Sequence, residues 1–171
     1  MATAREPEPD AVEWVRERWA AQDLPEAGRF AAVAAVMRAH AVIVAELDRA
    51  LRPVGIGRTS YLALLTLALS KGGARPPSYL SRYLLVHQTT VTNLLDHAEK
   101  QGWVRREPHP TDRRASLAVL LPPGRAIVRE ATAAAAAVGF GVGDVDEATL
   151  ATLTQALRGV REAVGDLPRA R

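Results

Sequence analysis

Two segments near opposite ends of the chain carry apolar residues at alternating intervals of three and four. This spacing is typical of helices that pack on a partner helix. The first set, which includes one histidine, is Phe30, Val33, Met37, His40, Val44, Leu47 and Leu51. The second set is Leu150, Leu153, Leu157, Val160 and Val164. We therefore predict a long helix in each segment and a helical dimerisation lobe; an ordinary bundle core within one subunit is the alternative.

Between these segments the pattern predicts three short helices. The first is almost wholly apolar, as a buried central helix is, and Thr59 is its expected N-cap. Gly102 is the expected stop of the third helix. The three predicted ranges are Tyr61–Leu69, Ser78–Leu84 and Gln88–Gln101.

Beyond Gly102 the apolar residues change to the period of two that strands show. Residues 103–107 and 116–120 are predicted to form two short strands around the charged, turn-rich segment Pro108–Arg114. This two-stranded β-hairpin is the only sheet that we predict. The expected fold class is therefore mainly α, with a small α+β unit formed by the short helices and the hairpin.

Two further helices are predicted, and a capping motif marks the start of the last helix. Asp10 is expected to cap a short helix at Ala11–Ala20, and an alanine-rich helix is expected at Pro122–Val138. Asp144 and Glu147 have the spacing of a capping box at the start of the last helix.

Composition and charge narrow the possible functions. The 171 residues include no cysteine, which excludes disulfide scaffolds, thiolate catalysis and zinc fingers. The net charge is only +3, so any nucleic-acid contact depends on where the basic residues lie. The first ten residues are polar, and no stretch approaches the ~20 apolar residues that span a bilayer. We therefore expect a cytoplasmic protein with no membrane segment.

The predicted helix at 88–101 has one apolar and one polar face. The face expected to be buried holds Val91, Leu94, Leu95 and Ala98. The start of the polar face carries amide and hydroxyl side chains, which can bond base edges in the DNA major groove. The candidate base readers are Gln88, Thr89, Thr92 and Asn93. Lys100 and Arg82 are expected to contact only phosphates, and a solvated amphipathic helix is the alternative.

The predicted hairpin is rich in arginine. Arg105, Arg106, Arg113 and Arg114 are offset within the hairpin only by Glu107 and Asp112, so four positive and two negative charges leave +2. A charged turn is more often a solvated loop. Directly behind a helix of this kind, however, it could reach the neighbouring minor groove or its phosphates.

The ordered run from Pro77 to Gly124 resembles the DNA-binding lobe of the MarR (multiple antibiotic resistance regulator) family. The resemblance rests on Leu80, then VHQTTVTNLLDHAEKQGWVRREPHPTDRRA, then the strand and Gly124. It implies a homodimer with interleaved terminal helices, whose two lobes bind the halves of a pseudo-palindromic operator on double-stranded DNA. It also implies that a wing arginine, Arg113 or Arg114, contacts the minor groove.

The resemblance implies three segments. Residues 1–57 and 122–171 would supply the dimerisation helices, and residues 58–121 the winged helix-turn-helix lobe. His87 occupies the position where the family usually has a Ser or Thr cap, so it either contacts a phosphate or base or has a purely structural role. Pro122 stands where the family usually caps its next helix with Thr.

Family resemblance further implies a small-molecule effector held between the lobes. The extra N-terminal helix, with Trp14 and Trp19, is similar to that of the urate-responsive subgroup, but Leu62 stands where that subgroup has an acidic residue. An apolar or aromatic effector is therefore expected. The candidate ligand-binding residues are Trp14, Arg29, His40 and Tyr61; ordinary core or interface positions are the alternative.

Neither catalysis nor a cofactor is expected. The histidines, His40, His87, His97 and His109, include no pair at i, i+4, so a metal site would need distant helices to come together. We find no glycine-rich phosphate loop, nucleophile elbow or suitably placed carboxylate pair. The expected function is a repressor released from DNA by a small ligand. The alternative is a ligand- or partner-binding protein on the same scaffold without specific DNA recognition.

Overall fold

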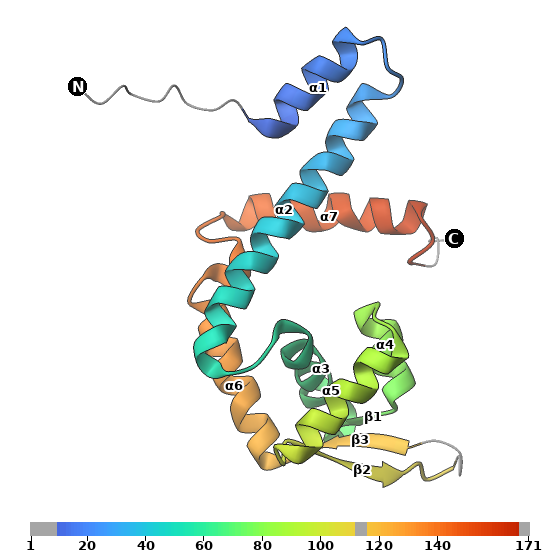
Figure 1. Cartoon of the computed structure of the whole chain (residues 1–171), viewed down its shortest axis with the longest axis vertical. Helices are drawn as coiled ribbons and strands as arrows, with labels where there is room; N and C mark the ends of the chain where they lie inside the picture. Colours follow the sequence, from blue (N-terminus) through green and yellow to red (C-terminus); the bar gives the residue numbers. More distant parts are fainter. Residues whose placement is uncertain (1–9, 112–115, 168–171) are drawn as a thin grey trace, which may run out of the picture.

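A computed structural model of the chain describes residues 10–111 and 116–167. The part of the chain that is described consists of long terminal helices and a compact lobe of short helices with a small sheet (Figure 1). The helices of the compact lobe are α3 (Arg58–Leu69), α4 (Pro77–Leu84) and α5 (Gln88–Lys100). Its strands are β1 (Ala74–Arg75), β2 (Val104–Pro108) and β3 (Ser116–Leu120).

The sheet has three antiparallel strands in the order β1-β3-β2, so the prediction of a two-stranded sheet was wrong. The predicted hairpin is present, with Val104 opposite Leu120 and Pro108 opposite Ser116. The additional strand β1 pairs Ala74 with Val119. A strand of two residues is too short to show a period-two pattern, so this strand could not be predicted from the sequence.

Side chains from every helix of the compact lobe meet in one core. The fully buried residues include Leu64 and Leu67 of α3, Leu80 of α4 and Val104 of β2. The predicted inner face of α5 is confirmed, because Val91, Leu94, Leu95 and Ala98 are all buried in the same cluster. The core therefore fixes which face of α5 points to solvent.

The remaining helices are longer and less buried. They are α1 (Ala11–Ala21), α2 (Ala27–Leu51), α6 (Pro122–Ala136) and α7 (Glu147–Ala163). Three short 3₁₀ helices connect elements: η1 (Arg52–Val54), η2 (Lys71–Gly73) and η3 (Gly139–Gly141). In the view of Figure 1, α2 runs away from the compact lobe and α7 lies across α2. Much of their apolar stripe is exposed, including Met37 at 67% and Val160 at 53%.

Helix α2 corrects one expectation about membranes. The continuous helical stretch Ala27–Val54 is long and apolar enough to cross a bilayer by length and composition, whereas the sequence had suggested no such stretch. Only 6% of its most apolar window is buried within the chain. One helix of this kind is weak evidence for a membrane segment, because interface and core helices have the same composition.

Two predicted helix caps were misplaced. Helix α7 is capped by Asp146, not Asp144: its carboxylate accepts hydrogen bonds from Thr149 Oγ1 at 2.7 Å and from the Thr149 amide at 2.9 Å. These bonds lower the pKa of Asp146 below its ordinary value of 3.8. Helix α3 begins at Arg58 after extended Gly57, so Thr59 lies inside the first turn. The Asp10 cap of α1 is confirmed, since its carboxylate accepts from the amides of residues 12 and 13.

Gly124 joins the first turn of α6 to the base of the hairpin. A Cβ at this position would overlap the Trp103 carbonyl oxygen and lie 2.6 Å from Leu120 Cδ1. The same carbonyl accepts a 2.9 Å hydrogen bond from the Leu121 amide. Only glycine permits this approach without movement of the backbone.

Candidate nucleic-acid interface

Helices α4 and α5 form a helix-turn-helix. Helix α4 ends at Leu84, and the next residue, Leu85, has left-handed angles of φ 53° and ψ 40° and reverses the chain. The chain then becomes extended at His87, the residue before α5. Leu80 of α4 and Val91 of α5 belong to the same buried cluster, which holds the two helices together. The turn therefore presents the N-terminal half of α5 on the outside of the lobe.

His87 caps α5. Its Nδ1 accepts a 3.2 Å hydrogen bond from the Thr89 backbone N–H and lies 3.0 Å from Thr89 Oγ1. An imidazole whose Nδ1 accepts carries its proton on Nε2, which makes Nε2–H a donor. The structural role that the sequence left open is therefore present. A phosphate or base contact through Nε2–H stays a prediction.

The four predicted base readers all lie on the exposed side of α5, but they differ in whether their side-chain polar groups already have a hydrogen-bond partner. Thr92 Oγ1 donates to the Gln88 carbonyl at 3.1 Å, and Thr89 Oγ1 lies against His87. The side-chain amides of Gln88 and Asn93 are exposed and have no hydrogen-bond partner among the described residues. These two amides are therefore the groups best able to form bidentate bonds with a base.

The arginine cluster of the hairpin is less basic than the sequence indicated. Arg106 Nη2 lies 2.5 Å from Asp96 Oδ1, and its Nη1 lies 3.2 Å from Glu99 Oε2. Arg105 Nε donates to Glu107 at 2.6 Å. The sequence count included Glu107 but not the two acids of α5, which only the fold brings to the hairpin. Asp112, Arg113 and Arg114, the predicted wing tip, lie outside the described residues.

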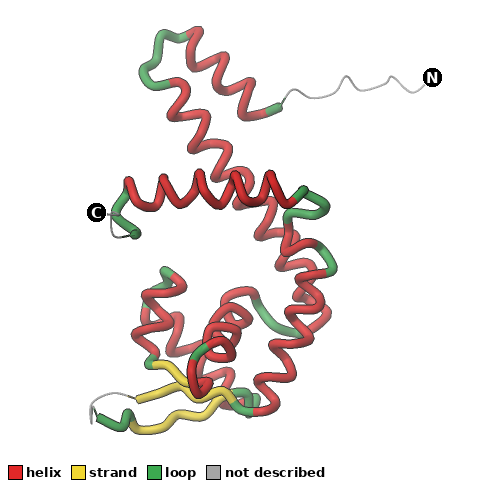
Figure 2. The backbone as a smooth tube through the Cα atoms, turned by 180° about the vertical axis from the view of Figure 1, so that it is seen from behind, coloured by secondary structure: helices red, strands yellow, loops and turns green. Residues whose placement is uncertain are grey.

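The hairpin projects from the end of the molecule farthest from α1, as Figure 2 shows. Lys100 is exposed at the end of α5, on the same lobe. Arg82 is exposed on α4 and shares a hollow of about 240 Å³ with Tyr79 and Tyr83, whose rings are stacked at 5.9 Å. Both cations are thus accessible, as their predicted phosphate contacts require.

The four predicted ligand-binding residues lie on three helices. Trp14 is half-exposed on α1, and Arg29 and His40 are exposed on α2. Tyr61 of α3 is buried, and its hydroxyl lies 3.1 Å from Thr132 Oγ1 of α6. Because Thr132 donates its own proton to the Val128 carbonyl, the Tyr61 hydroxyl is the donor in this pair.

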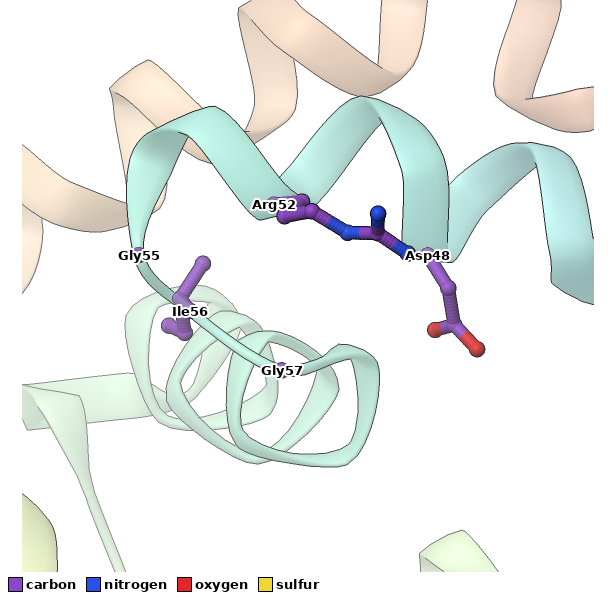
Figure 3. A pocket seen from close by; sticks show the side chains of 5 residues that line it. All are labelled: Asp48, Arg52, Gly55, Ile56 and Gly57. Atoms are coloured by element: carbon purple, nitrogen blue, oxygen red, sulfur yellow. The ribbon is translucent and has the colours of Figure 1, made fainter.

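A hollow of about 460 Å³ lies at the junction of α2, η1 and α3 and includes none of these four residues (Figure 3). It is lined by Asp48, Arg52, Gly55, Ile56 and Gly57. Asp48 is paired with Arg58 at 3.3 Å, which ties the end of α2 to the start of α3. Within residues 10–111 and 116–167, no three histidine or acidic side chains gather in a metal-binding group.

Comparison with known proteins shows which protein family this chain belongs to. A family model described as MarR family matches residues 54–115, which include α3, α4, α5 and β2. The crystal structure of Sco5413, a MarR family transcriptional regulator from Streptomyces coelicolor, is 34% identical and covers 83% of this chain and 99% of that one, with a TM-score of 0.74. The chain belongs to the MarR family.

Other MarR-type proteins match over shorter parts. Sco3205 of Streptomyces coelicolor, solved in complex with DNA, is 27% identical over 77% of this chain and 84% of that one, with a TM-score of 0.70. The transcriptional repressor MprA of Escherichia coli K12 is 31% identical over 94 residues, or 55% of this chain. The chain spans about half the length of the curated relatives it matches, 53% in the case of MprA. The predicted family and the mainly α, winged-helix fold are confirmed.

Proposed function

We propose that this MarR-family chain is a sequence-specific DNA-binding regulator, a homodimeric repressor that a small apolar or aromatic ligand releases from a pseudo-palindromic operator. The observation that carries the proposal is the outer face of α5. Gln88 and Asn93 present amides that have no partner among the described residues, next to a hairpin wing. The similarity to Sco3205, which was solved in complex with DNA, supports DNA binding by this chain.

The major groove suits this helix. B-DNA's major groove is ~12 Å wide and admits an α-helix, and an Asn or Gln amide can bond adenine N6 and N7 together. The first turn of α5 also offers backbone N–H groups and the positive end of the helix dipole to a phosphate. In this arrangement Lys100 and Arg82 contact phosphates, and Arg113 or Arg114 enters the minor groove.

The exposed apolar stripes of α2 and α7 support the homodimer. Val33, Met37, Leu153 and Val164 are between 43% and 74% exposed in the single chain. A second copy that covers these side chains would remove a large apolar surface from water. We therefore assign dimerisation to residues 1–57 and 122–171 and DNA binding to residues 58–121, in a cytoplasmic protein.

Effector binding completes the proposal. We keep Trp14, Arg29, His40 and Tyr61 as its residues, because they lie along α1, α2 and α3, which follow one another from the N-terminal helices into the compact lobe. The partly buried pair between the Tyr61 and Thr132 hydroxyls links α3 to α6, so movement of either helix would alter it. In the proposed mechanism, the lobes adopt one arrangement that binds DNA and another that does not. A ligand that binds one arrangement more tightly than the other would change the affinity for DNA by that difference.

The experiment is selection of binding sites from a random duplex pool with the full chain, followed by fluorescence anisotropy at several salt concentrations. We expect an inverted repeat, bound ~10³-fold or more tightly than its scrambled version. Affinity for both should fall with salt, since phosphate contacts release counterions. A pool that never converges, with equal weak binding to all duplexes, would favour a ligand- or partner-binding protein instead.

A further inference from the structure

Arg106 connects the hairpin to the recognition helix. It lies on β2, and its guanidinium contacts Asp96 and Glu99, which are one turn apart on α5. Its backbone N–H also donates to Glu99 Oε1 at 3.2 Å. The Arg106 side chain is 34% exposed, less than that of its neighbour Arg105 at 57%. Three contacts therefore join the second strand of the sheet to the last turns of the helix.

Arg105 forms an ion pair of a different kind. Its partner Glu107 lies two residues farther along the same strand, so the two side chains share one face of β2. Because both residues lie on β2, this pair does not connect one helix or strand to another. Arg106 points to the opposite face of the strand, the face on which α5 lies. The adjacent arginines thus make a matched pair, one between elements and one within a strand.

The contacts of Arg106 lie close to the point where β2 leaves α5. The connection from α5 to β2 is short: the Trp103 amide donates to the Ala98 carbonyl at 2.9 Å, and Gly102 has a φ of 67°. This connection sets where β2 starts, and the guanidinium contacts α5 two residues farther along the strand. Two residues of β2 lie beyond Arg106 and extend about 7 Å, so a tilt of about 10° at its base moves the end of the strand by about 1 Å.

The local charge argues against a phosphate contact by the same guanidinium. One arginine faces two carboxylates, so the cluster is negative by one charge. A phosphate would have to displace an acid that already holds Arg106.

We propose that Arg106 is a positioning residue for DNA recognition, which braces the wing against the recognition helix and contacts no phosphate. The proposal rests on the proposed function, since it concerns how two DNA-binding elements are held in register. An electrostatic role and a bracing role predict opposite consequences when the acids are removed. If the role is electrostatic, neutralising Asp96 and Glu99 frees a cation and strengthens binding to the operator. If Arg106 is a brace, the same change loosens the wing and weakens binding to the operator.

The test compares R106Q, the double variant D96N/E99Q, the triple variant D96N/E99Q/R106Q and the control R105Q with the wild-type chain. Affinity for the selected duplex and for its scrambled version is measured by anisotropy across a salt series, with circular dichroism to verify folding. We expect R106Q and D96N/E99Q each to lower the ratio of specific to non-specific affinity about tenfold, and the triple variant to be no worse than either. R105Q should leave the ratio within about twofold.

The salt slope separates the two roles. Loss of a phosphate contact lowers the slope of log affinity against log salt by about 0.9, whereas loss of a brace leaves it unchanged. R106K, which can hold one acid but not both, should recover part of the ratio. The brace is overturned if D96N/E99Q raises the ratio, or if R106Q reduces the slope by one contact. A wild-type chain that does not discriminate between the duplexes would overturn the proposed function itself, a result that the wild-type curves alone reveal.

Discussion

Replacing Gly124 with alanine would place a methyl group against the base of the wing. The new Cβ would overlap the Trp103 carbonyl oxygen, lie 3.0 Å from its carbonyl carbon and lie 2.6 Å from Leu120 Cδ1. Two of these three atoms belong to the backbone, which cannot rotate away as a flexible side chain can. The start of α6 must therefore shift, and the 2.9 Å bond from the Leu121 amide to the Trp103 carbonyl is strained.

The expected loss of stability follows from these contacts. Overpacking of a dense site typically destabilises by 1–3 kcal/mol, and backbone involvement places this site near the top, at about 3 kcal/mol. Alanine gains at most about 1 kcal/mol over glycine in a helix. The net change is therefore about 2 kcal/mol, which for a chain of this length lowers Tm by about 4–8 °C.

Thermal unfolding followed by circular dichroism measures this change. Protein concentration must be held fixed, because the melting temperature of a dimer depends on it. Gly28→Ala is the control, since a Cβ at that position of α2 meets nothing within 4 Å, and it should melt at or above the wild-type temperature. If Gly124→Ala melts within about 1 °C of wild type, the packing argument is wrong.

Four further changes test other parts of the structure. Asn93→Ala should weaken binding to the selected duplex about 10- to 100-fold, measured by anisotropy, with little change on scrambled DNA. Lys100→Gln should instead weaken both and reduce the salt slope by about 0.9; an unaltered slope would remove it from the interface. Met37→Glu should convert the dimer to monomer in light scattering, whereas Leu69→Glu, 79% exposed but outside the stripe, should not. Because capping lowers the pKa of Asp146 from its ordinary 3.8, its stabilisation is complete above that value and is lost as pH falls through the lowered pKa. Asp146→Asn should remove this acid-dependent part of the melting curve, and an unchanged pH profile would contradict it.

Strong local signals made much of the fold predictable. Helix α5 was predicted within one residue at its end, because an apolar face and Gly102 mark it independently. Strand β3 was predicted at its observed bounds, because a short, mostly apolar run follows the charged turn there. Strand β1 was missed because it exists only through pairing with β3. The N-caps at Gly57 and Asp146 are set by extended backbone angles. Residue type alone does not distinguish these positions from the predicted caps, Thr59 and Asp144.

The candidate site was predictable in its residues but not in their contacts. The polar face of α5 follows from helical periodicity, so the exposure of Gln88 and Asn93 could be foreseen. The bond from Thr92 to the Gln88 carbonyl depends on a rotamer. The pairing of Arg106 with Asp96 joins residues ten positions apart on different elements, and counting charges along the hairpin could not find it.

Hydroxyl-radical footprinting of the full chain on the selected duplex tests the central claim most directly, because it shows where a specific regulator sits on DNA. Two copies that each insert α5 into the major groove should protect two symmetry-related segments, with centres about 10 bp apart or a multiple of that spacing. Addition of scrambled DNA in moderate excess should leave the pattern in place. Uniform protection that moves with the duplex ends, or disappears on addition of scrambled DNA, would contradict sequence-specific recognition by this face.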